Sequence, residues 1–237
     1  MAKTSPLLLG GSLKKAGVVI YQRNGQTIMR VAHSDERRSC TRGQFIQRMR
    51  MRHTTALWQS LKPCHPVFCN GKSVYARFAT LSNSLPAVFV PCKGHLSGAS
   101  FLMPSMPMSD GNLPTVKQWL GEAYGSAALL TNLKASDLNR GEILRLYTAE
   151  QRIEGRTPRL RFVQIRDVER NEFVEVDGHL ALVDEAFADE KKGWALVRLD
   201  GDRCSTQTLV TRCRLYEQYT TEEALLEAAK SYGGLTE

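Results

Sequence analysis

Two short runs of β-branched and aromatic residues near the N-terminus predict a β-hairpin. The runs cover residues 17–22 and 27–31, and Arg23-Asn24-Gly25-Gln26 separates them. Asn-Gly is the preferred pair for a type I′ turn, because both central residues of that turn need positive φ. The residues that follow, 32–39, are polar and charged and predict a loop.

A helical pattern begins after this loop. Thr41 and Gln44 have the spacing of a capping box, which places the first helical turn there. At about 100° per residue, one helix face is apolar and consists of Phe45, Ile46, Met49, His53, Ala56, Leu57 and Leu61. The opposite face consists of Arg48, Arg52, Thr55, Gln59 and Lys62. Pro63 is expected to end the helix, because proline lacks the backbone donor that would continue it.

The middle of the chain is rich in proline, with six of the nine prolines in residues 63–113. A second Asn-Gly pair, Asn70-Gly71, predicts a hairpin between 66–69 and 74–78. The Met, Pro and Ser stretch 103–111 predicts an exposed linker. The chain is therefore expected to form two domains, a basic hairpin and helix domain over 1–102 and an acidic, β-rich domain over 112–237.

From about residue 142 the pattern becomes that of β-strands. Residues 159–166 alternate polar and apolar, which is typical of a strand with one solvated face. The expected strands are 143–151, 159–166, 172–176, 179–183, 194–199 and 206–216. Asp200-Gly201 predicts a further hairpin turn, and a capping box of Thr220 and Glu223 predicts a final helix over 220–232.

Six strands at this spacing predict a small antiparallel β-sandwich of the immunoglobulin type. The predicted fold class is therefore α+β, with a basic β-hairpin and helix followed by this sandwich and a C-terminal helix. No internal repeat or low-complexity tract interrupts this order.

The charge of the chain is unevenly distributed. The net charge of +8 divides into +10 for residues 1–62, +2 for 63–110 and −4 for 111–237. Asymmetry of this size is typical of a surface that binds a polyanion or an acidic partner. Residues 37–52 hold six arginines and no acidic residue, whereas an ordinary solvated helix pairs its cations with glutamates.

These observations predict a non-enzymatic protein that binds nucleic acid or belongs to a nucleoprotein. The expected nucleic-acid-binding residues are Lys14, Lys15, Arg23, Arg30, Arg37, Arg38, Arg42, Arg48, Arg50 and Arg52. An acidic protein surface, or no partner at all, remains open for these residues. The rival hypothesis is a structural subunit, such as a phage-like virion component or another homo-oligomeric assembly, whose basic helix packs on an acidic neighbour.

The composition also bears on the compartment. The longest apolar run near the N-terminus, Leu7-Leu8-Leu9, is too short for a signal peptide, and no run approaches a membrane span. A cytoplasmic protein, or a virion component if the rival hypothesis holds, is therefore expected, with no membrane partner. Its six cysteines are expected to be buried free thiols rather than a disulfide framework.

No motif for catalysis or for a cofactor stands out. Gly71-Lys72-Ser73 resembles the end of a P-loop, but Pro66 occupies the position of the required first glycine. Four residues, Cys64, Cys69, Cys92 and His95, could hold zinc, although the spacing of the first two is at the edge of the usual range. We expect a turn at the first motif, and neither a metal nor a cofactor. The histidine on the apolar helix face, His53, is expected to be a core residue with a hydrogen-bond partner.

The N-terminal third resembles a family of small basic bacterial proteins of unknown function. The resemblance covers residues 10–62 and rests on Lys15-Ala16-Gly17, the Arg23-Asn24-Gly25 turn, Arg30, and Thr41, Gln44 and Arg48 at the helix start. Members of that family open with a Gly-Lys-x-Gly hairpin and a Pro-x-Thr-x-x-Gln-x-x-x-Arg helix. Here Lys14 and Cys40 replace the first glycine and the proline. The resemblance implies an immunoglobulin-like C-terminal β domain.

Overall fold

The computed structural model describes residues 18–23, 26–31, 40–68, 73–91, 98–138, 141–155 and 157–236. The chain forms two compact units, Met1–Ser39 and Cys40–Glu237. In the first unit, strand β1 (Val18–Arg23) pairs antiparallel with β2 (Gln26–Val31). Arg23 lies opposite Gln26, so two residues connect the strands. The predicted hairpin is confirmed, while its Asn24-Gly25 turn lies outside the described residues.

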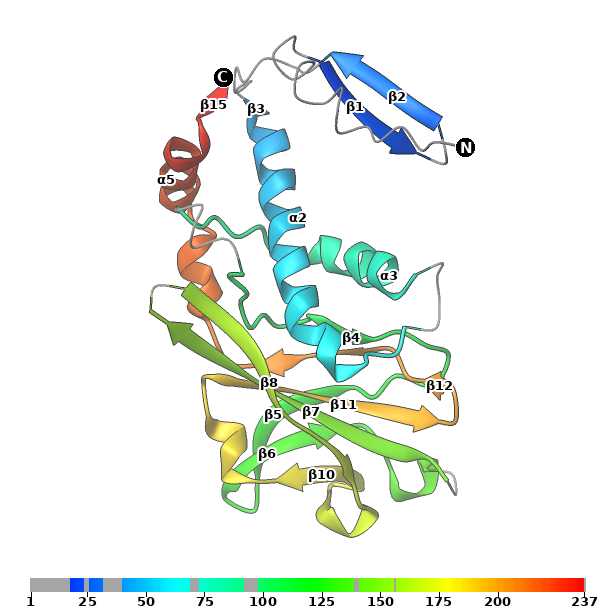
Figure 1. Cartoon of the computed structure of the whole chain (residues 1–237). Coiled ribbons are helices and arrows are strands. Elements are labelled where there is room, and N and C mark those ends of the chain that lie inside the picture. Colours follow the sequence, from blue (N-terminus) through cyan, green and yellow to red (C-terminus); the bar gives the residue numbers. More distant parts are fainter. Residues whose placement is uncertain are drawn as a thin grey trace. The chain divides into compact units, whose positions relative to one another are not determined.

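The second unit contains the other helices and strands of the described residues (Figure 1). Its helices are α2 (Arg42–Leu61), α3 (Val74–Leu81) and α5 (Glu222–Tyr232). Short 3₁₀ turns include η3 (Ala135–Asp137), η5 (Glu185–Ala188) and η6 (Leu215–Tyr219). Its strands are β3 (Cys40–Thr41), β4 (Pro107–Ser109), β5 (Gln118–Ala123), β6 (Ser126–Thr131), β7 (Ile143–Glu154), β8 (Thr157–Val168), β9 (Phe173–Val176), β10 (His179–Val183), β11 (Lys192–Asp200), β12 (Arg203–Cys204), β13 (Gln207–Thr208), β14 (Val210–Thr211) and β15 (Leu235–Thr236).

Two antiparallel sheets form the β-sandwich. One has the strand order β5-β6-β10-β9, and the other has β12-β11-β7-β8, with β14 also paired to β11. Counted along the chain from β5, this first sheet holds the first, second, sixth and fifth strands. The seven-stranded immunoglobulin sandwich instead groups the first, second, fifth and fourth, and here the fourth strand, β8, belongs to the other sheet. The predicted α+β architecture with a sandwich is therefore confirmed.

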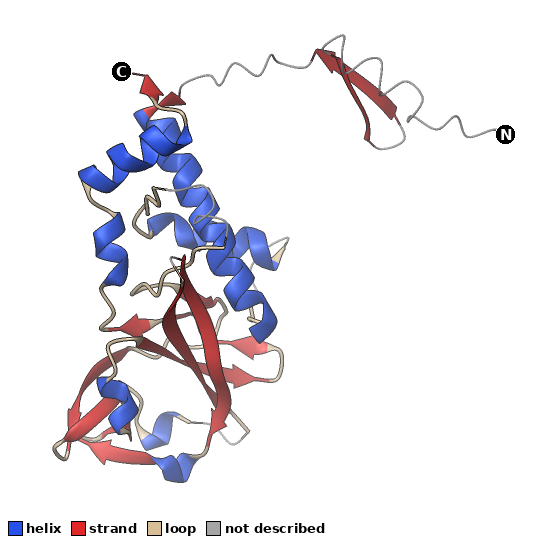
Figure 2. Ribbon diagram, turned by 60° about the vertical axis from the view of Figure 1, so that its left-hand side comes forward, coloured by secondary structure: helices blue, strands red, loops and turns tan. Residues whose placement is uncertain are grey.

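The five-stranded sheet is covered on both faces at β11, whereas much of its edge strand β8 is exposed. Figure 2 shows helices on one side of it and the four-stranded sheet on the other. Along β11, Trp194 and Leu196 point into the core between the sheets, while Ala195 and Val197 join the core under the helices. Because side chains alternate along a strand, a strand buried on both faces must be apolar almost throughout, as this one is.

Helix α2 begins and packs as its sequence predicts. The Gln44 N–H donates to the Thr41 hydroxyl at 3.4 Å, and the Thr41 N–H donates to the Gln44 side chain at 3.3 Å. These two bonds complete the capping box. The buried residues of the helix are Phe45, Met49, His53, Thr54, Ala56, Leu57 and Leu61, which reproduce the predicted apolar face apart from Ile46 and Thr54.

The predicted hairpin at residues 66–78 is wrong, because its second half forms helix α3. The Ser73 hydroxyl accepts a hydrogen bond from the Ala76 N–H at 3.1 Å and so caps this helix. Phe78 is fully buried, with its ring 5.3 Å from Trp58 of α2 and 6.0 Å from Phe68. Packing of this aromatic cluster favours a helix over a strand at residues 74–81. The Asn70-Gly71 pair lies outside the described residues.

The predicted linker at 103–111 is also wrong. Its three methionines, Met103, Met106 and Met108, are fully buried, as are Phe101 and Leu102 just before it. The Leu209 N–H donates to the Met106 carbonyl at 2.8 Å, which holds the segment against the chain before β14. Flexible methionines fill irregular core space, so the segment joins the helical core to the sheet. The boundary between compact units lies instead between Ser39 and Cys40.

The remaining strand predictions are largely confirmed. The predicted strand 206–216 is instead broken into β13, β14 and η6, and the C-terminal helix is capped by Thr221 rather than Thr220. The sequence pattern does not predict strands β5 and β6, because alanine and glycine weaken their β pattern. Tyr124 and Gly125 connect them with φ of 53° and 78°, the left-handed pair that a tight hairpin needs.

Candidate nucleic-acid interface

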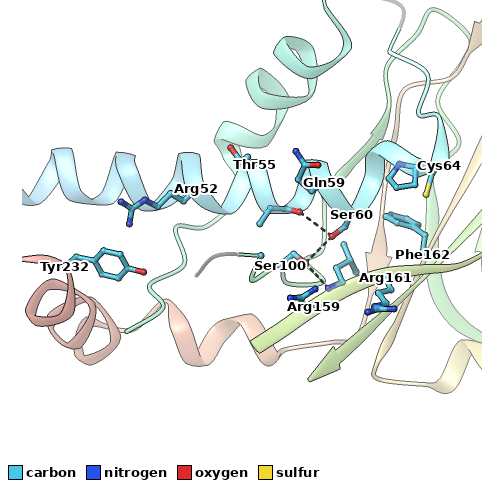
Figure 3. Close-up of a pocket in the computed structure, with 14 residues that line it drawn as sticks. Arg52, Thr55, Gln59, Ser60, Cys64, Ser100, Arg159, Arg161, Phe162 and Tyr232 are labelled. Atoms are coloured by element: carbon cyan, nitrogen blue, oxygen red, sulfur yellow. Dashed lines mark hydrogen bonds between the residues drawn. The ribbon is translucent and has the colours of Figure 1, made fainter. Parts of the chain in front are cut away.

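A groove of about 880 Å³ lies between α2 and β8. Helix α2 contributes Arg52, Thr55, Ala56, Gln59 and Ser60 to its lining, and β8 contributes Arg159, Leu160, Arg161 and Phe162. Pro63, Cys64, Gly98, Ser100 and Tyr232 complete it. Figure 3 shows these residues arranged along the space between the helix and the strand. The site therefore joins residues that are more than a hundred positions apart in the sequence.

The groove is cationic. Three guanidinium groups line it, from Arg52, Arg159 and Arg161, and none of the described lining residues is acidic. Arg159 and Arg161 both reach Glu154, at 3.3 Å and 2.5 Å. One carboxylate thus faces two guanidinium groups, which leaves an excess of positive charge along this edge of the sheet.

Arg52 is positioned by an aromatic ring rather than by an acid. Its guanidinium carbon lies 4.9 Å from the centre of the Tyr232 ring of α5. Among the described residues, no carboxylate forms an ion pair with it. A cation held over a ring keeps most of its N–H donors available to an anion.

A short hydrogen-bond chain fixes the two walls of the groove. The Ser60 and Ser100 hydroxyls lie 3.2 Å apart, and the Leu160 N–H donates to the Ser100 hydroxyl at 2.9 Å (Figure 3). The Ser100 N–H in turn donates to the Pro158 carbonyl at 3.0 Å. The segment around residue 100 therefore ties α2 to the outer edge of β8 and sets the width of the groove.

The predicted basic residues fall into several environments. Arg48 and Arg52 are exposed on α2, and Arg42 pairs with Glu222 of α5 at 3.2 Å. Arg50 is half-buried, and its Nε has no hydrogen-bond partner among the described residues. Two residues, Arg23 and Arg30, lie on the hairpin strands of the other unit. Four more, Lys14, Lys15, Arg37 and Arg38, lie outside the described residues.

Of the predicted residues whose side chains the structure describes, only Arg52 lines the groove. Arg159 and Arg161, which were not among the predicted residues, lie on β8 and contribute the second basic wall. Their alternation with Leu160 and Phe162 is visible in the sequence, but it predicts only a strand with one solvated face. Nothing local indicates that this strand lies beside the basic helix.

The other candidate groups concern nucleophilic and metal chemistry. Burial raises the pKa of the Cys64 thiol to about 11, so the thiol is protonated at neutral pH and is a poor nucleophile. Cys40, Cys204 and Cys213 are buried, as predicted, whereas Cys64 is only half-buried. Within the described ranges, no three metal-ligating side chains gather, but Cys69, Cys92 and His95 of the candidate zinc set lie outside those ranges. No helix of the described chain is both long and apolar enough to cross a bilayer.

His53 is a core residue, as predicted, but one of its ring nitrogens lacks the hydrogen-bond partner that was also predicted. Its Nε2 is buried and meets no hydrogen-bond partner among the described residues, and its ring lies 5.7 Å from that of Phe101. Burial disfavours the charged imidazolium and lowers the pKa of His53 to about 4.

This histidine is expected to make stability depend on pH. Unfolding returns the pKa of His53 from about 4 to about 6.5, so between these values the unfolded chain binds more protons. The free energy of unfolding should therefore fall as pH decreases through this window, by up to about 3 kcal/mol from His53 alone. Urea unfolding of His53→Leu at several pH values should show a flatter profile than the parent protein, and the exposed His65→Asn serves as control. Parallel profiles for His53→Leu and the parent would contradict the assignment.

Comparison of the chain with family models, with curated proteins and with solved structures gives no match. The resemblance to a family of basic bacterial proteins therefore stays a prediction, and functional inference rests on the geometry of the site.

Proposed function

We propose that this protein binds nucleic acid without catalysing a reaction, through arginines of α2 and β8. The observation that carries this proposal is the groove lined by Arg52, Arg159 and Arg161, with no acidic residue in its described lining. Arg48 extends the same positive charge along the exposed face of α2. Arginine suits this task because its planar group binds phosphate through two parallel hydrogen bonds.

The solvent exposure of the groove arginines favours a role in binding a ligand from solution over a role in stabilising the fold. The Arg159 and Arg161 side chains are 45% and 52% exposed. Ion pairs at such exposure contribute little to folding, so their exchange for a phosphate contact costs little. Helix arginines without acidic neighbours repel each other, and a bound polyanion relieves that repulsion.

The salt dependence of binding tests this function. Replacing both Arg48 and Arg52 with glutamine should make the slope of log K against log salt shallower by about 1.8 on duplex DNA or about 1.4 on a single strand. The reason is that binding releases fewer counterions when two phosphate contacts are lost. The slope is measured by fluorescence anisotropy, and circular dichroism checks the fold. Arg203→Gln with Arg214→Gln removes the same charge from outside the groove and should keep the parent slope.

The second candidate is a structural subunit whose basic helix packs on an acidic protein surface. The Arg42–Glu222 ion pair favours it, because it shows a carboxylate of a neighbouring helix meeting an arginine of α2. Size-exclusion chromatography with and without nuclease separates the two functions. Nucleic acid that co-purifies and is removed by nuclease supports the first, whereas a large nuclease-resistant homo-oligomer free of nucleic acid supports the second.

A further inference from the structure

We infer that the groove between α2 and β8 takes a single-stranded segment of nucleic acid, with an unpaired base stacked on the Arg52 guanidinium. This inference rests on the proposed function, because it names the form of nucleic acid that the same site binds. Two features carry it, namely the stack of Arg52 on Tyr232 and the mixed lining between the two basic walls (Figure 3).

The stack of Arg52 on Tyr232 prepares a flat binding surface. The guanidinium is planar, lies over the ring at 4.9 Å and belongs to an exposed residue. Because the ring restrains the side chain, binding costs less conformational entropy than it would for a free arginine. Unpaired bases stack on aromatic rings and on guanidinium planes in proteins that bind single strands.

The lining between the basic walls suits a sugar and a base better than a row of phosphates. Ala56 and Phe162 are apolar, and Thr55 and Gln59 are uncharged hydrogen-bonding residues. Phosphates would contact the guanidinium groups on either side, while base edges would meet the amide and hydroxyl groups. The volume of about 880 Å³ lies within the range of sites that enclose most of a small organic ligand.

A duplex would use this groove poorly. In a duplex each base is stacked between its neighbours and paired on its inner edge, so only phosphates and groove edges are available to a protein. The stacking surface and the uncharged lining would then stay unused. Single strands expose base faces without prior unpairing, so the groove should discriminate in their favour.

Replacing Arg52 with lysine separates stacking from charge. The wild-type protein should bind a short oligo-uridine or oligo-thymidine about tenfold more tightly than a duplex of equal length at about 50 mM salt. Arg52→Lys keeps the positive charge but loses the planar group. This variant should lose most of the preference for single strands while its salt slope on the duplex is unchanged. Arg214→Lys, at a side chain that is 82% exposed and outside the groove lining, is the matched control and should keep the preference.

The outcomes distinguish this inference from the function on which it rests. If the wild-type protein binds no nucleic acid at low salt, both are overturned. If it binds duplex and single strand equally, or if Arg52→Lys keeps the full preference, the nucleic-acid function stands and the single-strand inference is overturned. Displacement of the oligonucleotide by poly-glutamate at equal charge concentration would also overturn the single-strand inference. Poly-glutamate has negative charge but no bases, so such displacement would mean that charge alone explains the binding.

Discussion

Replacing Phe101 with alanine is expected to lower the free energy of unfolding by about 3–5 kcal/mol. Phe101 is fully buried, with its ring 4.9 Å from that of Tyr219 and 5.7 Å from that of His53. Its removal leaves a cavity between α2 and η6, where packing on both sides limits collapse. Urea unfolding monitored by circular dichroism measures the change.

Leu226→Ala is the matched control, because this leucine lies on α5 with about half of its surface exposed. A surface substitution of this kind should change the free energy of unfolding by no more than about 0.5 kcal/mol. If Phe101→Ala is equally mild, residues 101–108 do not belong to the core. Limited proteolysis gives a second measure, because a buried segment should resist early cleavage.

Breaking the ion pair between Arg198 and Glu142 is expected to lower the free energy of unfolding by a similar amount. The Arg198 guanidinium donates to Glu142 at 2.7 Å and to the Asp137 carbonyl at 3.0 Å. The two paired side chains are only 6% and 3% exposed. Glu142→Gln leaves a buried cation opposite a neutral amide, so the free energy of unfolding should fall by about 3–5 kcal/mol. Urea unfolding again provides the measurement.

Two further variants make this result specific. Adding Arg198→Met to Glu142→Gln removes the uncompensated charge and should recover much of the lost stability. Asp167→Asn breaks another 2.7 Å pair, with Arg145, whose side chains are 35% and 48% exposed. That loss should stay below about 1 kcal/mol. Equal losses for the two pairs, or no recovery in the double variant, would contradict the role assigned to burial.

Both predictions concern features that the sequence analysis did not recognise. Proline and serine between Met103, Met106 and Met108 predict a linker, yet all three methionines are fully buried. Arg198 lies on β11, next to the apolar residues Leu196 and Val197. Nothing near it in the sequence indicates that it pairs with Glu142. In each case the deciding contact is distant along the chain.

The sequence by itself determined the elements whose signals are local. The β1–β2 hairpin follows from its Asn-Gly pair, and α2 follows from the Thr41–Gln44 capping box together with an apolar face of helical period. The sandwich strands from β7 to β11 follow from their apolar patterns. These signals depend on residues within a few positions of each other, where backbone preference and side-chain hydrogen bonding act directly.

Only the tertiary structure decided the rest. Phe78 makes residues 74–81 a helix by packing on α2, and β8 lies beside α2 because the segment around Ser100 bonds to both. The basic groove exists because this arrangement brings Arg159 and Arg161 to the helix that carries Arg52. Burial of apolar surface is non-directional and acts between any segments that can meet, so a local pattern does not reveal which ones do.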